Sequence, residues 1–344
     1  MGNVFSSKKE SVLFPEFSAN LQRLDGKIVA ITGCTTGTGF FAAKLCAEKG
    51  AEVIMLNRPS ERAKSALERV KEAAPGAKVS HIDCDLSDFE SVKKAAAEIK
   101  SAVKKLNVLC NNAGVMAFPD TATKDGYDIQ MQTNHLSHFL LTRELIPLLE
   151  AAVSAGEEGR VVNHSSLARK RQEELKAEYF GKNGGNLGGD GWGTMLEGPR
   201  WVRYQQTKLA NMCFTSALHK KLVAAGSKVK VVVAAPGVAD TNLLENIPGG
   251  KSDGEDGPSW VFKLVAPAYG ALMMQSAEDG ACPLLTAMFS NEVQSLDFYE
   301  PSGGASGPAT KKEWEPHCCS EANEAVLWKA SAEAVGEFEV PPSK

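Results

Sequence analysis

The chain alternates short apolar runs with longer segments of helical pattern, and this alternation restricts its fold more than any other feature. The predicted strands, most of them apolar, occupy 27–32, 53–57, 78–83, 106–111, 160–164 and 228–234. Strands that are joined through a helix lie parallel, and right-handed crossovers place the helices on both faces of the sheet. The sequence therefore predicts an α/β fold, with a single doubly wound parallel sheet in a three-layer α/β/α arrangement.

Several segments lie outside this alternation. Residues 167–200 form an insertion, and its part from Gly181 to Gly193 holds seven glycines in thirteen residues, which predicts a mobile loop. We divide the chain into an N-terminal segment (1–24), one domain (25–300) that contains the insertion, and a helical C-terminal extension (301–344). Helices in the second half are predicted at 128–150, 201–225 and 321–336.

Composition argues against a nucleic-acid partner, and hydropathy excludes a membrane-spanning helix. The 38 basic and 42 acidic side chains give a net charge of −4, and a nucleic-acid-binding protein normally shows a basic excess, so we expect no nucleic-acid partner. No apolar run reaches the ~18 residues of a membrane-spanning helix.

The eight cysteines lack paired zinc-binding spacing, so we expect reduced core thiols in a cytosolic protein and no metal site. For the adjacent pair Cys318 and Cys319, redox activity and lipidation stay open.

The first residues match the N-myristoylation pattern M-G-x-x-x-[ST], with Gly2 as the acceptor. Two lysines, Lys8 and Lys9, follow closely. One acyl chain with a small basic patch gives only reversible attachment to an anionic membrane surface. The sequence thus predicts a cytoplasmic protein that contacts a membrane peripherally if Gly2 is acylated. The alternative is a disordered start that fits the pattern by chance.

A glycine-rich loop joins the first predicted strand to the first predicted helix. Glycines let the backbone approach a pyrophosphate, and the helix N-terminus offers unpaired N–H groups to it. This arrangement is typical of a Rossmann-type dinucleotide-binding fold. The candidate cofactor-binding residues of the loop are Gly33, Thr35, Thr36, Gly37, Thr38 and Gly39.

The end of the second predicted strand indicates which dinucleotide is bound. An acidic residue at this place would accept a hydrogen bond from the ribose 2′-hydroxyl of NAD, but the chain has Asn57 and Arg58 instead. A guanidinium suits a 2′-phosphate, because it offers a forked, charge-assisted contact. We therefore expect NADP(H) as the cofactor. The alternative is that Arg58 is a solvated side chain at a helix start.

A phenol and an ammonium lie four residues apart at Tyr204 and Lys208, a spacing that puts both on one face of a helix. A neighbouring positive charge lowers the pKa of a phenol towards neutrality, where it can serve as an acid or a base. Ser166 follows the predicted strand 160–164, at the sheet edge where α/β proteins bind ligands. These residues indicate chemistry on a carbonyl or an alcohol.

Taken in order, the motifs resemble those of the short-chain dehydrogenase/reductase superfamily, over about 25–300, and in particular its retinol-dehydrogenase-like branch. The resemblance implies Tyr204 as the general acid or base, Lys208 as the group that lowers its pKa and contacts the nicotinamide ribose, and Ser166 as the residue that orients the substrate oxygen. It also implies that Asn134 supports a water-mediated proton relay. Further cofactor contacts implied by matching motifs are Asp85, Leu86, Asn112, Ala113, Gly114, Pro236, Gly237, Val238 and Thr241.

These observations predict an NADP(H)-dependent oxidoreductase that interconverts a carbonyl and an alcohol on a hydrophobic, retinoid-, steroid- or lipid-like substrate. Two alternatives stay open: a photoreductase similar to protochlorophyllide reductases, and a non-catalytic NADP(H)-binding sensor or scaffold. The oligomeric state is open, a homodimer included.

His135 and His138 are interpreted as packing or hydrogen-bonding residues. The apolar helix predicted at 260–274 belongs either to the core or to a substrate pocket. Aromatic and apolar insertion residues are expected to border the substrate cleft: Tyr179, Phe180, Trp192, Met195 and Trp201.

Overall fold

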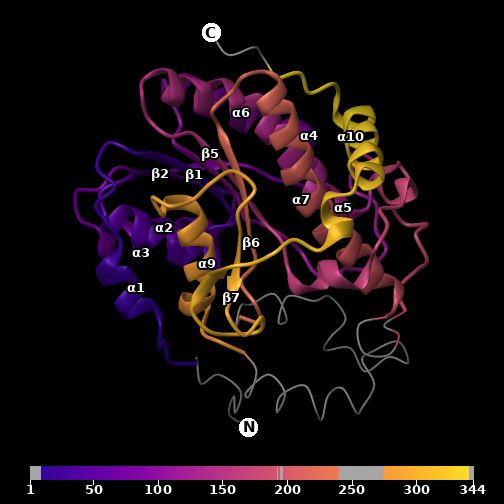
Figure 1. Ribbon diagram of the computed structural model, residues 1–344, viewed down its shortest axis with the longest axis horizontal. Helices are drawn as coiled ribbons and strands as arrows, with labels where there is room; N and C mark the ends of the chain where they lie inside the picture. The colour runs from indigo at the N-terminus through magenta and orange to yellow at the C-terminus, as the bar shows by residue number, and fades with distance from the viewer. Residues whose placement is uncertain (1–8, 192, 194–196, 240–273, 341–344) are drawn as a thin grey trace.

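The computed structural model describes residues 9–191, 193, 197–239 and 274–340. Within these ranges an eight-stranded sheet has the order β3-β2-β1-β4-β5-β6-β7-β8, and its first seven strands are parallel (Figure 1). The predicted fold, a doubly wound α/β sheet, is confirmed. The strands are β1 (Ile28–Thr32), β2 (Glu52–Asn57), β3 (Val79–Asp83), β4 (Val108–Asn111), β5 (Arg160–His164), β6 (Lys230–Ala234), β7 (Phe298–Pro301) and β8 (Ala309–Lys311).

Helices cover both faces of the sheet (Figure 1). On one face lie α1 (Phe14–Asn20), α2 (Gly37–Glu48), α3 (Glu61–Ala73) and α9 (Ala277–Phe289). On the other lie α4 (Phe89–Ala102), α6 (Ser137–Ser154) and α7 (Pro199–Ala224), with α10 (Glu321–Val335) packed on α7. Strand side chains alternate between two apolar cores, so that Val29 and Ile31 of β1 face α2 and α9 while Ala30 faces the other layer.

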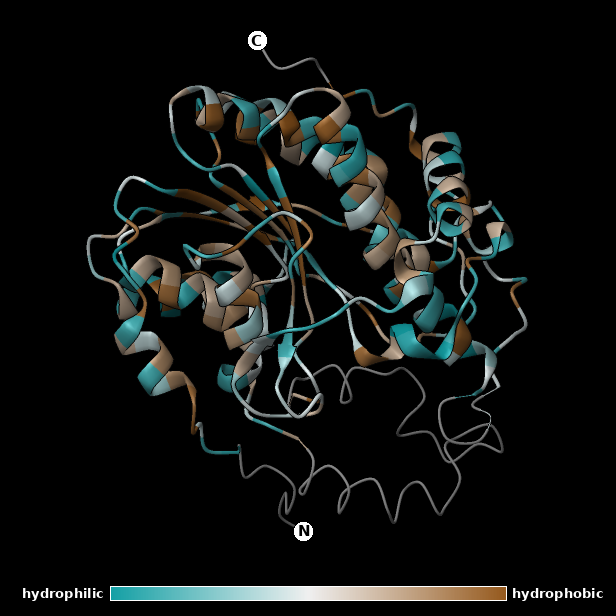
Figure 2. Ribbon diagram, viewed as in Figure 1, coloured by the Kyte–Doolittle hydropathy of each residue, from teal (hydrophilic) through white to brown (hydrophobic). Residues whose placement is uncertain are grey.

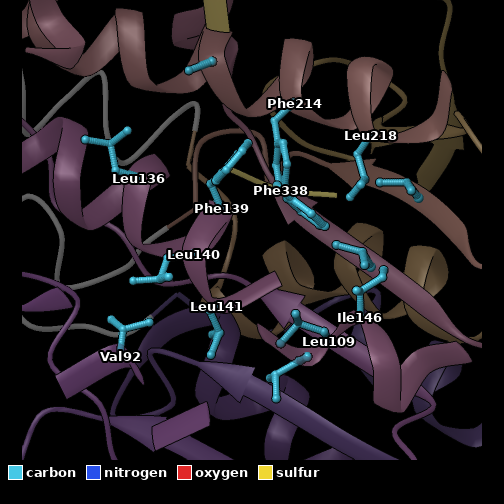
Figure 3. Close-up of a cluster of buried hydrophobic side chains, with 14 of the residues drawn as sticks. Val92, Leu109, Leu136, Phe139, Leu140, Leu141, Ile146, Phe214, Leu218 and Phe338 are labelled. Carbon is cyan, nitrogen blue, oxygen red and sulfur yellow. The ribbon is translucent and has the colours of Figure 1, made fainter. Parts of the chain in front are cut away.

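The larger core lies between the sheet and the layer of α4, α6 and α7. Figure 2 shows the apolar residues gathered on the central strands and on the inward sides of the helices. In Figure 3, Phe139 of α6 and Phe214 of α7 meet Phe338, which follows α10. The ring centroids of Phe139 and Phe338 are 5.3 Å apart at 88°, an edge-on geometry that aromatic pairs favour. The C-terminal extension is therefore packed into this core.

Two predicted elements differ from the observed ones. The helix predicted at 128–150 is divided into α5 (Ile129–Met131), a π-helical turn η1 (Gln132–Leu136) and α6. Such turns often occur at functional sites, and Asn134 lies in this one. The boundary predicted at residue 300 falls inside β7, because β8 continues the sheet as an antiparallel edge strand. No helix in the described ranges is long and apolar enough to cross a membrane.

The segment before β1 is attached to the domain through α9. The buried carboxylate of Asp279, in the first turn of α9, accepts hydrogen bonds from the Ser11 hydroxyl and from the backbone N–H groups of Val12, Leu13 and Phe14. Burial raises the pKa of Asp279, but these donors more than offset it and hold the pKa below its usual value. Residues 11–20 are thus a docked part of the fold.

Candidate active site

The glycine-rich loop closes tightly between β1 and α2. Gly33 and Gly37 have φ of 73° and 63°, a region that favours glycine. A Cβ atom at Gly39 would lie 2.3 Å from both the Asn112 side-chain nitrogen and the Gly33 carbonyl oxygen, so only glycine fits there. Thr36 precedes α2, and its side chain makes no capping hydrogen bond. The first N–H groups of α2 are therefore offered to an anion, as a bound pyrophosphate requires.

Asn112 and Ala113 hold the loop from the neighbouring strand β4. The backbone N–H groups of Asn112 and Ala113 donate to the Thr32 hydroxyl, at 3.0 and 2.9 Å. The Asn112 side chain donates to the Thr32 carbonyl at 2.8 Å and accepts from the Thr38 hydroxyl at 3.0 Å. The predicted cofactor-binding residues of the glycine-rich loop and the predicted contacts Asn112 and Ala113 therefore lie at one place, at the carboxyl edge of the sheet.

Asn57, at the end of β2, has an unused donor. Its side-chain oxygen accepts from the Cys34 N–H at 2.6 Å, whereas its buried amide nitrogen has no hydrogen-bond partner among the described residues. Arg58 is exposed directly after it. Buried donors are normally satisfied, so an orphan donor beside an exposed guanidinium suits an oxygen-rich ligand at this edge.

Asp85, unlike Asn57, has its side chain occupied within the fold, because its carboxylate accepts hydrogen bonds from the N–H and the hydroxyl of Ser87. Leu86 is buried.

Asn134 connects the end of β4 to α7. Its side-chain oxygen accepts from the Val115 N–H at 2.7 Å, and its amide nitrogen donates to the Val115 carbonyl and to the Thr207 hydroxyl, at 2.9 and 3.0 Å. A Cβ atom at Gly114 would lie 3.2 Å from the side-chain oxygen of Asn134 and 3.5 Å from the Nζ atom of Lys208. The fold thus brings Gly114, Asn134 and Lys208 together, as their motifs predict.

Tyr204 and Ser166 meet at the centre of the site. Their side chains share a hydrogen bond, although they come from α7 and from the turn after β5. Burial raises the pKa of Tyr204 to about 12, and the bond with Ser166 lowers it in part. Lys208 lies one turn along α7, and burial lowers its pKa to about 8. The lowered phenol pKa that the spacing to Lys208 predicts is therefore not found in the chain alone, where burial of Tyr204 is the largest effect and raises its pKa.

The loop after β6 contains the next predicted motif. Gly237 has φ of 68°, and a Cβ atom there would lie 2.3 Å from the carbonyl oxygen of Ala305 in the β7–β8 hairpin. The Val238 N–H donates to the same oxygen at 2.8 Å. Pro236 accepts from the Gln275 side chain. Thr241 and the helix predicted at 260–274 lie outside the described residues, apart from Met274.

The insertion is more strongly attached than its composition predicts. The carboxylate of Asp120 accepts from the backbone N–H groups of Gly185, Leu187 and Gly189, at 2.9, 2.6 and 2.9 Å. The buried guanidinium of Arg203 donates to the carbonyls of Leu187 and Gly189. The part from Gly181 to Asp190 forms no helix or strand, as predicted, but its backbone is anchored beside Tyr204.

The aromatic residues of the insertion do not share one location. Trp201 packs edge-on against Tyr204, with ring centroids 6.4 Å apart. Tyr179 and Phe180 belong to the large core instead, and the Phe180 ring lies 5.7 Å from that of His135. The expectation that these two residues border the substrate cleft is therefore wrong, since they are the apolar anchor of the insertion. Trp192 and Met195 lie outside the described residues.

His135 and His138 form hydrogen bonds inside the fold. His135 Nε2 lies 2.8 Å from the Ser331 hydroxyl. His138 Nδ1 donates to the Asn134 carbonyl at 3.0 Å, so its Nε2 accepts from the Thr32 hydroxyl. Burial lowers the pKa of His138 to about 4, which keeps the ring neutral. The predicted hydrogen-bonding role is confirmed for both.

Comparisons with known proteins agree with this geometry. The short chain dehydrogenase family model matches residues 27–182. An uncharacterized oxidoreductase of Schizosaccharomyces pombe is 32% identical, with 81% of this chain and 77% of that protein covered. Retinol dehydrogenase 13 of Homo sapiens is 30% identical, with 91% of this chain and 86% of that protein covered. A crystal structure of an uncharacterized protein from Mycobacterium paratuberculosis superimposes with a TM-score of 0.70 at 29% identity, over 94% of this chain and 98% of that one.

The doubly wound sheet and these relatives together identify the protein as an oxidoreductase, and the chain belongs to the short-chain dehydrogenase/reductase family. Within that family it belongs to the retinol-dehydrogenase-like branch. Solved structures that share the fold at lower identity include a Brucella melitensis 3-ketoacyl-(acyl-carrier-protein) reductase complexed with NADH, at a TM-score of 0.57, 22% identity and 79% of this chain against 96% of that one.

Sequence reasoning missed Arg169, Arg203 and Asp120. All three are charged residues that lie buried next to the site, and each is held by partners far away in the sequence. A charged residue with a distant partner has no local signature. The available signal was closeness in the sequence, since Arg203 directly precedes Tyr204 and Arg169 follows Ser166 by three residues.

Proposed function

We propose that the protein is an NADP(H)-dependent oxidoreductase that interconverts a carbonyl and an alcohol on a hydrophobic small molecule. The observation that carries this proposal is the hydrogen bond between Tyr204 and Ser166, beside Lys208 and the glycine-rich loop. Two hydroxyls that converge on one point can hold one substrate oxygen. The unused donor of Asn57 and the exposed Arg58 support NADP(H) in preference to NAD(H).

Each residue of the site has a role in this proposal. Tyr204 gives its proton to the carbonyl oxygen in reduction and takes the alcohol proton in oxidation. Ser166 orients that oxygen, and Lys208 stabilises the phenolate with its positive charge. Asn134 fixes the end of β4 to α7 and supports the return of a proton through ordered water. Bound NADP(H) supplies or accepts the hydride at its nicotinamide ring.

The surroundings of Tyr204 support an apolar substrate. Tyr204 forms a small cluster with Ala117 and Trp201, and Met116 and Ala168 pack against it. An apolar wall beside the acid–base group favours an apolar substrate, because burial of both surfaces stabilises the complex. Two relatives have names that state retinol and polyprenol as substrates. We therefore include retinoid- and lipid-like aldehydes and ketones in the proposed substrate class.

The proposed location is the cytoplasm. Acylation of Gly2, which lies outside the described residues, would add reversible contact with a membrane surface. Comparison of the wild type with Gly2→Ala in a vesicle sedimentation assay, after expression with an N-myristoyltransferase, tests this part. Equal sedimentation of the two proteins would refute it.

The decisive test is a turnover assay with purified protein, a panel of hydrophobic aldehydes and ketones, and either NADPH or NADH. We expect NADPH oxidation in darkness, and loss of about 100-fold or more in kcat for Tyr204→Phe with the Kd for NADPH nearly unchanged. NADPH binding without turnover would favour the sensor or scaffold. Turnover that requires light and a bound pigment would favour the photoreductase. Full activity of Tyr204→Phe would refute the assigned acid.

A further inference from the structure

Arg169 is a fully buried charge three residues after the candidate catalytic serine, Ser166. It lies in the 3₁₀ turn η2 (Leu167–Arg171), for which Ser166 is the N-cap, and its exposed fraction is 0%. Arginine is rarely buried completely, because its charge must then be matched inside the protein. None of the motifs that hold the cofactor or the substrate oxygen includes this residue, so its burial requires another explanation.

Two carboxylates from the C-terminal part of the chain match the charge. Glu315 accepts from the Nε and Nη2 atoms of Arg169, both at 2.9 Å, which is the forked geometry that guanidinium groups favour. Glu300, on β7, accepts from Nη2 at 2.9 Å. The guanidinium also lies 4.4 Å from the ring centroid of Phe298. These contacts fix the plane of the group against the β7–β8 hairpin.

The remaining donor of the group points to the active site. Nη1 of Arg169 donates to the backbone carbonyl of Ser166 at 3.0 Å. On the other side of the same residue, the Ser166 hydroxyl accepts from the Ala168 N–H at 3.3 Å. Ser166 is therefore held at its carbonyl and at its hydroxyl, and this leaves the hydroxyl proton and one lone pair for Tyr204 or a substrate.

We infer that Arg169 is a positioning residue for Ser166: with Glu300 and Glu315, it fixes the direction in which the serine hydroxyl meets the Tyr204 phenol. The catalytic part of this inference rests on the proposed function. The same hairpin also holds the 236–238 loop, since Ala305 accepts from Val238 and closes against Gly237. The β7–β8 hairpin thus fixes the positions of both Ser166 and the 236–238 loop. This hairpin lies C-terminal to the segment that the family model matches.

A matched control lies on β5, the strand that precedes Ser166 and Arg169. Arg160 begins β5, has a side chain only 2% exposed, pairs with Glu158 and donates to the carbonyls of Ala287 and Ser290. It resembles Arg169 in burial and in its kinds of partner, but it lies at the opposite end of β5 from Ser166. Arg160→Lys therefore reports the general cost of replacing a buried arginine by lysine.

The experiment compares the wild type, Arg169→Lys, Arg169→Met, Glu300→Gln and Arg160→Lys. Hydrogen–deuterium exchange of peptides that span 165–172 shows whether the turn is loosened, and turnover with NADPH gives kcat, KM and their pH dependence. We expect faster exchange and a fall in kcat of about 10- to 100-fold for the Arg169 and Glu300 variants, with the Kd for NADPH nearly unchanged. The alkaline limb of the pH profile should also move, because the hydroxyl that meets Tyr204 is displaced. Arg169→Lys should retain more activity than Arg169→Met.

Two results would overturn the inference. Unchanged exchange at 165–172 in Arg169→Lys would show that this residue does not fix the turn, whether or not the protein is active. Equal losses of kcat in Arg169→Lys and Arg160→Lys, with an unmoved pH profile, would show a purely structural role. A wild type that reduces no carbonyl would instead refute the proposed function and the catalytic part of this inference, and the exchange result would still decide whether Arg169 holds the turn.

Discussion

The Nζ atom of Lys208 lies 5.6 Å from the ring centroid of Tyr204 and donates a hydrogen bond of 3.1 Å to the carbonyl oxygen of His164. The ammonium is thus held between the end of β5 and the phenol, on the face of α7 that points to the sheet edge. Burial strengthens the electrostatic effect of the ammonium on the Tyr204 phenol. Burial also makes the ammonium unfavourable for the stability of the folded state, because few solvent dipoles remain to stabilise its charge. Stability and catalysis are therefore opposed at this residue.

Replacement of Lys208 by methionine should abolish turnover but stabilise the fold near neutral pH. The folded pKa of Lys208 is about 8, against 10.5 for an exposed lysine, so below pH 8 the folded state carries a buried ammonium. Removal of this buried ammonium should raise the free energy of unfolding by up to about 3 kcal/mol, minus the contribution of the hydrogen bond that is lost with it. Above pH 8 the wild-type residue loses its proton on its own, and the advantage of the variant should shrink towards pH 10.5. Urea denaturation at several pH values measures this, and a constant difference would contradict it.

Replacement of Arg58 by alanine should weaken NADPH binding about 10-fold or more and leave NADH binding nearly unchanged, because only NADPH carries the 2′-phosphate. Titration calorimetry with both dinucleotides gives the two affinities. Lys94→Ala, which removes an exposed cation on α4, is the control for general electrostatic attraction. Equal losses for the two cofactors would show that Arg58 does not contact the phosphate.

Replacement of Gly39 by alanine should destabilise the fold by about 1–3 kcal/mol and weaken binding of either dinucleotide, because the new methyl group would displace Asn112 or the Gly33 carbonyl. Thermal unfolding and fluorescence titration with NADPH measure the two effects. Gly191→Ala is the control, since its nearest neighbour is the Pro199 ring at 3.5 Å, an ordinary contact. Wild-type affinity in Gly39→Ala would argue against the loop as the pyrophosphate site.

Replacement of Asp120 by asparagine should release the glycine-rich part of the insertion. Three backbone N–H groups lose a charged acceptor, and the buried Arg203 loses one of its two carboxylate neighbours, so we expect a stability loss of about 2–4 kcal/mol. Limited proteolysis should cut between 185 and 191 several-fold faster than in the wild type. Asp25→Ala, an exposed carboxylate paired with Arg23, should leave the cleavage rate unchanged. Identical rates for Asp120→Asn would show that the anchoring is not needed to order the segment.

Local signals in the sequence were sufficient for the motif residues and for six of the eight strands, β1 to β6, whereas β7 and β8 were not predicted. Apolar runs mark central strands such as β1 and β2 closely, because a strand that is buried on both faces is mostly apolar, whereas the edge strand β3 is only partly buried and contains Ser80, His81 and Asp83. Helix α3 begins where Ser60 caps it, a start signal readable in the sequence. Gly33, Ser166 and Tyr204 come together because each lies at the carboxyl end of a strand or on the helix that covers it, and a parallel sheet gathers these ends on one edge.

Features that depend on distant partners could not be predicted in the same way. The pairs that Arg169 forms with Glu300 and Glu315 span 131 and 146 positions. No periodicity indicates which of many charges will meet. The glycine-rich part of the insertion was interpreted as mobile because glycine is intrinsically flexible, but Asp120 supplies hydrogen bonds that a composition-based argument does not include. The raised pKa of Tyr204 likewise follows from burial, which the four-residue spacing to Lys208 does not report.

The attachment of residues 11–14 to Asp279 has a practical consequence for shortened forms of the protein. A truncation that removes residues 1–24 would look harmless in the sequence, because it ends before the first strand. It would leave a buried carboxylate on α9 without four of its hydrogen-bond donors, directly against the helix that follows the glycine-rich loop. Expression and crystallisation should therefore start no later than Lys9, and purification tags are better placed at the far terminus.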